Sequence, residues 1–96
     1  MIYHNKKLLE TCRLIECQVC GIDDGTVCAA HANSQQFNKG MGIKASDAMC
    51  ASLCFKCHSE LDNGHNLSRE ERVEMWTNAY IKTMRVLIER GLLVVA

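Results

Sequence analysis

The chain has 96 residues and a formal net charge of zero, from 11 Lys and Arg against 11 Asp and Glu. This length suits one domain with a modest core. No apolar stretch follows the opening Met1–Lys7 and no run is long enough to span a membrane, so we expect a cytoplasmic protein without a signal peptide. The balanced charge excludes the broad basic surface of most compact nucleic-acid binders, and any contact with nucleic acid must use a local patch, a metal ion or a partner.

The first half of the chain predicts a short lead-in and a hairpin. Residues 1–16 mix charges with leucines, which indicates a short helix or an irregular segment. Residues 26–31 are small and β-branched and predict a strand that ends at His31. Residues 33–46 are polar and interrupted by glycines, as in a flexible loop, and residues 47–53 predict a second strand. The two strands would form a hairpin with a long connection.

The second half predicts two helices. The first would run from Cys54 to Leu61 and stop at the turn residues 62–64. The second, over 68–90, begins with a capping box of Ser68 and Glu71. Its apolar residues recur at helical spacing: Val73, Trp76, Tyr80, Met84, Leu87 and Ile88.

After the long helix, Gly91 can adopt the left-handed conformation that ends a helix, and Leu92–Val95 could form a closing strand. We therefore expect a single α+β domain over residues 1–96. A small zinc-stabilised core would occupy 16–66, and the long C-terminal helix with its short terminal strand would occupy 67–96.

Two Cys-x-x-Cys pairs, Cys17 with Cys20 and Cys54 with Cys57, give the strongest chemical signal. Two residues between the cysteines let both sulfurs reach one ion from a tight turn, and two such turns supply tetrahedral coordination by four sulfurs. The pattern predicts a structural Zn²⁺ site. The alternative, redox-active or buried free thiols, does not explain why two independent pairs occur.

The remaining cysteines and a second motif have other interpretations. Cys12, Cys28 and Cys50 are expected to be small buried hydrophobic residues. Cys54–His58 also matches the attachment pattern of c-type haem, but that chemistry belongs to exported proteins and leaves the first cysteine pair unexplained. A redox or zinc-sensing switch is a further alternative that nothing in the sequence requires.

Two histidines would meet near the predicted hairpin. Taken alone, His31 could be a half-buried strand residue, and His58 could cap or pack beside the zinc pair. Together they stand at the end of the first strand and at the start of the following helix. A strand–strand–helix unit with a histidine on the strand and another on the helix is the ββα-metal arrangement of nucleases that use one metal ion.

With these motifs, the chain resembles the HNH nucleases whose ββα-metal core lies between two Cys-x-x-Cys pairs, and more narrowly the phage and prophage proteins of the YbcO type. The resemblance covers residues 16–96, and the block around His58 is its most specific part. The matching residues are Glu16-Cys-Gln-Val-Cys20, Ala30-His31, Asp47, Cys54-Phe-Lys-Cys-His-Ser-Glu-Leu-Asp62 and Glu89-Arg-Gly91.

The resemblance implies hydrolysis of phosphodiester bonds in DNA. His31 matches the general base that activates water, a role that suits a side chain titrating near neutral pH. His58 matches the ligand of a catalytic Mg²⁺ or Mn²⁺, and Asp62, four residues along the same helical face, would be a further ligand. For Asp62, a place in the turn that ends the helix is an equal alternative. Lys39 and Lys44 in the loop are the candidates to touch the DNA backbone, although an ordinary solvated loop explains them as well.

The chain departs from the family pattern at two positions. Ala30 stands where an acidic or histidine metal ligand usually precedes the base, and Met49 stands where an asparagine usually orients it. Asp47 or a backbone carbonyl could replace the asparagine, and Ser34 or His65 could supply other ligands. These departures and the neutral charge favour the alternative function, a non-catalytic zinc module that binds nucleic acid or protein. The apolar face of the long helix and the C-terminal Leu92–Val95 could support a homodimer.

Overall fold

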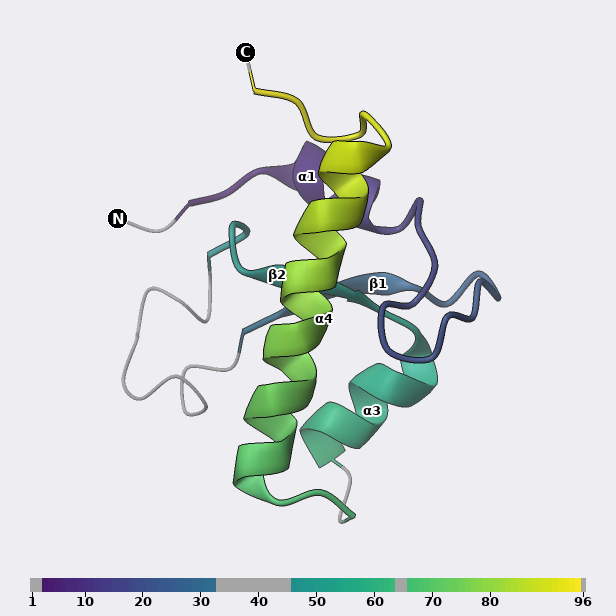
Figure 1. The fold of residues 1–96 in the computed structure, drawn as a ribbon, viewed down its shortest axis with the longest axis vertical. Coiled ribbons are helices and arrows are strands. Elements are labelled where there is room, and N and C mark those ends of the chain that lie inside the picture. The colour runs from purple at the N-terminus through teal and green to yellow at the C-terminus, as the bar shows by residue number, and fades with distance from the viewer. Residues whose placement is uncertain (1–2, 33–45, 64–65, 96) are drawn as a thin grey trace.

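A computed structural model describes residues 3–32, 46–63 and 66–95. Its elements, in chain order, are α1 (Lys6–Cys12), β1 (Cys28–His31), β2 (Cys50–Leu53), α3 (Phe55–Asn63) and α4 (Arg69–Glu89). In Figure 1 the long helix α4 crosses the two-stranded sheet, with α1 beside its C-terminal end and α3 beside its N-terminal half. The fold is a small α+β unit with a long C-terminal helix, as the sequence predicts. In the described part of the chain, no helix combines the length and the apolar character that a membrane span requires.

The sheet is an antiparallel hairpin of two short strands. Cys28 pairs with Leu53 at one end, and His31 pairs with Cys50 at the other. The strands are shorter than predicted, because Asp47 belongs to a turn that precedes β2. Successive side chains of a strand point to opposite faces, so Cys28 and His31, three positions apart, lie on opposite faces of the hairpin.

A buried cluster of apolar residues lies on each side of this hairpin. The larger one joins the hairpin to α3, to the first half of α4 and to the two Cys-x-x-Cys turns, residues 17–20 and 54–57, which we call the first and second knuckle. It includes Ala30, Ala51, Leu53, Leu61 and Trp76. The smaller one joins α1 to the C-terminal half of α4, through Cys12, Ile15, Cys50 and Leu87. The prediction that Cys12 and Cys50 are buried is confirmed, since neither is exposed at all.

Helix α4 has the start that the sequence predicts and a slightly different buried face. Ser68 and Glu71 form the capping box through both reciprocal hydrogen bonds. The fully buried line of the helix is Trp76, Ala79, Thr83 and Leu87. The assignment of Ile88 to this line is wrong, because one residue beyond Leu87 turns the side chain about 100° away and leaves it 57% exposed.

The end of α4 differs from the prediction. Gly91 takes the left-handed conformation, with φ of 72°, as expected. However, Leu92–Val95 form no strand: the amides of Leu92 and Leu93 both donate to the carbonyl of Leu87, at 2.8 and 3.1 Å, and turn the chain back at the helix end. Helix α3 also extends beyond the predicted end, to Asn63.

Candidate metal centre and histidine sites

The four knuckle cysteines come together in one cluster. Their sulfur atoms all lie within 4.8 Å of one another, and the sulfurs of Cys20 and Cys54 are 3.7 Å apart. Tetrahedral zinc with Zn–S bonds of about 2.3 Å requires sulfurs about 3.8 Å apart. Three of the cysteines are buried and Cys20 is exposed. The cluster therefore has the donors and the spacing to hold a structural metal ion such as Zn²⁺.

Backbone hydrogen bonds shape the first knuckle. The amide of Cys17 donates to the carbonyl of Ile22, and the amide of Gly21 donates back to the carbonyl of Cys17, both at 2.9 Å. Gly21 has φ of 79°, a conformation that a side chain would strain. The amide of Gln18 donates to the carbonyl of Ser52 at 2.9 Å, which fixes the knuckle to strand β2.

The second knuckle is the first turn of α3. Cys54 immediately precedes the helix, and the amide of His58 donates to its carbonyl at 2.9 Å. Cys57 follows one turn later, so that both sulfurs face the first knuckle. The same helical turn directs the next residue, His58, to a different side of α3.

The thiols of the cluster differ in acidity. Burial alone would raise the pKa of Cys17, but hydrogen bonds from backbone amides, first those of Cys20 and Cys54, outweigh it and lower the pKa to about 7. Burial raises the pKa of Cys54 and Cys57, and the neighbouring sulfurs raise that of Cys57 further. Packing several buried thiols side by side without a cation is unfavourable, and a divalent ion bound among them would relieve this.

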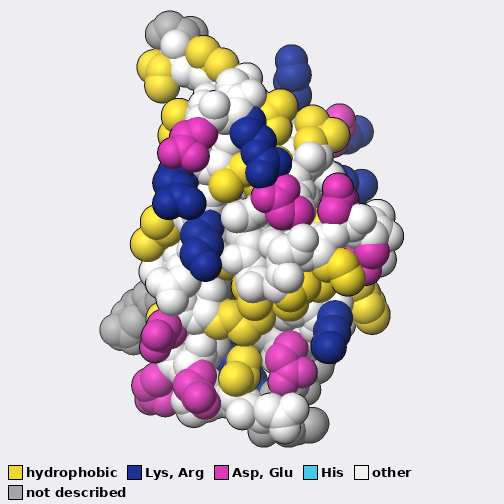
Figure 2. Space-filling model, turned by 45° about the vertical axis from the view of Figure 1, so that its right-hand side comes forward, with side chains coloured by type: hydrophobic (Ala, Val, Ile, Leu, Met, Phe, Trp, Pro, Cys, Tyr) yellow, Lys and Arg dark blue, Asp and Glu magenta, His cyan; other side chains and the backbone are white. Residues whose placement is uncertain are grey.

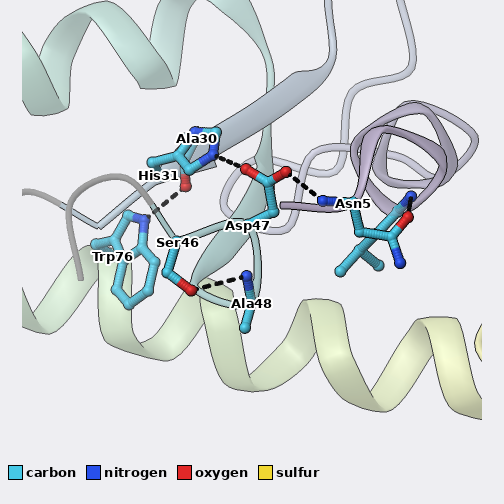
Figure 3. A network of polar contacts seen from close by, with 8 residues as sticks. Asn5, Ala30, His31, Ser46, Asp47, Ala48 and Trp76 are labelled. Carbon is cyan, nitrogen blue, oxygen red and sulfur yellow. Dashed lines mark hydrogen bonds and ion pairs between the residues drawn. The ribbon is translucent and has the colours of Figure 1, made fainter. Parts of the chain in front are cut away.

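His31 forms a close pair with Asp47 (Figure 3). Its Nε2 lies 2.8 Å from Oδ1 of Asp47, and the two side chains are 32% and 7% exposed. The other carboxylate oxygen accepts a 2.6 Å hydrogen bond from the amide of Asn5, just before α1. The bond to His31, followed by that from Asn5, lowers the pKa of Asp47. A buried carboxylate therefore holds one side of a partly exposed imidazole.

His58 has partners on both sides of its ring. Nε2 lies 3.1 Å from Oδ2 of Asp62, one turn later on α3. Nδ1 lies 3.3 Å from the sulfur of Cys28 on β1. Burial raises the pKa of the Cys28 thiol, an effect that the positive charge of Arg13 opposes. The predicted neighbourhood of His58 and Asp62 is present, whereas Cys28 was expected to be only a core residue.

The structure does not bring His31 and His58 to one centre. Cys28, the partner of His58, and His31 are three positions apart on β1, which is about 10 Å along the strand. The two strand residues also point to opposite faces of the hairpin. In Figure 1 α3 lies near the start of β1, and the far end of β1 lies on the other side of α4.

Four of the predicted site residues lie outside the described part of the chain: Lys39, Lys44, Ser34 and His65. Ala30 is fully buried, and Met49, at the position of the missing asparagine, packs against the larger apolar cluster. Asp47 is the group that contacts His31 instead.

The contact between Cys28 and His58 was not predicted from the sequence, because the distance between these two residues depends on the strand register.

Comparison of the chain with family models, with curated proteins and with solved structures gives no match.

Proposed function

We propose that this chain is an endonuclease that hydrolyses phosphodiester bonds in DNA, with His31 as the general base. The observation that carries the proposal is the 2.8 Å contact between His31 and the buried carboxylate of Asp47. The resemblance to HNH nucleases supplies the reaction class. The pair of side chains supplies a chemically reasonable way to activate water.

The chemistry follows from the two atoms in contact. With Asp47 ionised, the imidazole carries its proton on Nε2, which leaves Nδ1 as the atom that accepts a proton from water. The carboxylate also stabilises the imidazolium that forms, as in other histidine–carboxylate pairs. Since Asp47 accepts a second hydrogen bond from Asn5, the orientation of the ring is set by the N-terminal segment as well.

The resemblance implies a Mg²⁺ or Mn²⁺ ion held by His58 and Asp62, but in the structure Nε2 of His58 and a carboxylate oxygen of Asp62 lie 3.1 Å apart and contact each other. Such an ion would neutralise charge on a phosphate group. These two donors stand at the other end and on the other face of the hairpin from His31. They do not fit a single ion beside the water at His31.

The test is nicking of supercoiled plasmid by purified protein with added Mg²⁺ or Mn²⁺. We expect His31→Ala to lose about 100-fold or more of the wild-type rate, the usual contribution of a general base. Asp47→Asn should also lose activity, whereas Asp23→Asn, an exposed residue in the turn after the first knuckle, should not. Equal cleavage by His31→Ala and wild type would reject the proposal.

A second candidate function is a non-catalytic zinc module that binds another macromolecule. It is favoured by the exposed apolar side chains of the two knuckles, Val19, Ile22 and Phe55, at 42%, 46% and 69% exposure. Figure 2 shows a band of hydrophobic side chains across this side of the molecule, with basic and acidic side chains interspersed. This candidate function predicts that the protein nicks no plasmid with any added ion. It also predicts that Phe55→Ser loses binding to the macromolecular partner.

A further inference from the structure

The thiol of Cys28 and the ring of His58 face each other at the junction of β1 and α3. We propose that they form a second metal site, for a thiophilic divalent ion such as Zn²⁺ or Co²⁺, with Asp62 orienting the imidazole. This site is separate from the four-sulfur cluster and uses none of its ligands. The inference does not depend on DNA cleavage, because ion binding is measured without a substrate.

The spacing of the two donor atoms suits one ion. The sulfur of Cys28 and Nδ1 of His58 are 3.3 Å apart. Tetrahedral zinc with Zn–S of about 2.3 Å and Zn–N of about 2.0–2.1 Å places such donors about 3.5 Å apart. An ion could therefore bind both with a shift of a few tenths of an ångström. His58 is one-third exposed and Cys28 is half-buried, so water can fill the remaining coordination positions.

Asp62 makes Nδ1 the metal-binding nitrogen. Its carboxylate lies 3.1 Å from Nε2, where it accepts the ring proton and leaves the lone pair of Nδ1 directed at the sulfur. A histidine that binds metal through one nitrogen usually donates from the other to a carboxylate or carbonyl, and this partner fixes the ring. Asp62 is thus a positioning residue, and a direct ligand only if the ion sits on the Nε2 side.

The donor types decide which ion is preferred. A sulfur and an imidazole nitrogen favour zinc and similar transition metals, whereas Mg²⁺ prefers oxygen donors. The four-sulfur cluster offers a closed set of ligands, while Cys28 and His58 leave coordination positions open. The sulfur of Cys28 also donates a 3.6 Å hydrogen bond to the carbonyl of Leu53. A thiol that binds no metal would make this bond too, so the bond does not identify the ion.

The test counts ions on the full chain. Wild-type protein, Cys28→Ala and Cys28→Ser would be equilibrated by dialysis against buffered Zn²⁺ or Co²⁺, and bound metal measured by elemental analysis. We expect two ions per wild-type chain and one per chain in both variants. The Co²⁺ form of the wild type should gain a second increment of thiolate-to-metal absorption that Cys28→Ser lacks. A variant that keeps one ion has kept the four-sulfur cluster and the fold. If Cys28→Ala keeps no ion, Cys28→Ser alone decides whether the second site exists.

Substitutions on α3 separate the two sides of the His58 ring. Asp62→Asn should weaken the second ion by about 10–100-fold, the usual effect of removing an orienting carboxylate. Glu60→Gln, on the same helix but at a half-buried side chain that accepts a hydrogen bond from Asn66, should have no effect. One ion per wild-type chain would overturn the proposal. So would a second ion that survives both Cys28 substitutions but is abolished by Asp62→Asn, because that ion would be held by Nε2 and Asp62.

Discussion

The indole Nε1 of Trp76 donates a 3.0 Å hydrogen bond to the backbone carbonyl of Ala30, the residue before His31 (Figure 3). Trp76 is fully buried and stacks on Tyr80, with ring centroids 5.0 Å apart. This bond ties the middle of α4 to the end of the strand that carries His31.

Trp76→Phe should therefore destabilise the protein. It keeps an aromatic ring but removes the donor to a buried carbonyl, which should lower the free energy of unfolding by about 1–3 kcal/mol in urea denaturation. Tyr80→Phe is the matched control, since it removes a more exposed donor to the carbonyl of Ala48. If the free energy of unfolding falls by no more in Trp76→Phe than in Tyr80→Phe, this account is contradicted.

Thr83→Val should also destabilise the protein, although it preserves the shape of the side chain. The Thr83 hydroxyl accepts from the amide of Ser52 at 3.0 Å and donates to the carbonyl of Ala79 at 2.7 Å, and it is fully buried. Valine leaves the strand amide without this acceptor, at an expected cost of about 1–3 kcal/mol. Thr77→Val, on a less buried side of α4, should change stability by no more than about 0.5 kcal/mol. Equal effects of the two substitutions would refute the role of Thr83.

Asp47 should make stability depend on acid pH. Its pKa is lowered in the folded protein, so the stabilisation is fully present above the ordinary aspartate pKa of about 3.9 and is lost as the pH falls through the lower folded value. The difference between the urea midpoints of wild type and Asp47→Asn should therefore be largest above pH 5, begin to shrink below about pH 4, and vanish only below the folded pKa of Asp47. Glu16, whose pKa is lowered to about 2 by its bond to Arg90, is present in both proteins and does not enter the difference. A constant difference down to pH 3 would count against the pair.

Removal of metal should unfold the core. Structural zinc contributes on the order of 10 kcal/mol to small domains, so a strong chelator should abolish the cooperative melting transition, and added Zn²⁺ should restore it. Cys20→Ser should act like the chelator, although its exposed thiol contributes little packing. Cys28→Ser should keep the transition. A chelator-treated protein with an unchanged melting curve would exclude a structural metal.

The sequence predicted those features that depend on local spacing. The capping box of Ser68, the left-handed Gly91 and the two cysteine pairs each follow from residues a few positions apart, and all three are confirmed as structural features. The departure at Met49 also directed attention to Asp47, which contacts His31.

The features that failed depend on contacts between distant segments. Leu92–Val95 have the composition of a strand, but the turn at the helix end directs their backbone to Leu87. The meeting of His31 and His58 required a strand register that composition cannot supply. With Cys28 opposite Leu53, the start of β1 faces α3, and His31 is left on the other face.

The four-sulfur cluster joins Cys20 to Cys54 across 34 positions of the chain, and this ring encloses the whole hairpin. An ion at this point would tie the pair Cys17 and Cys20 to the pair Cys54 and Cys57, and so close a loop of chain around both strands. The entropy of closing such a loop rises only with the logarithm of its length, by about 0.6 kcal/mol for each doubling. A few residues more or fewer within this ring would therefore change the stability that the ion adds by well under about 0.6 kcal/mol, so the metal constrains the size of the ring only weakly.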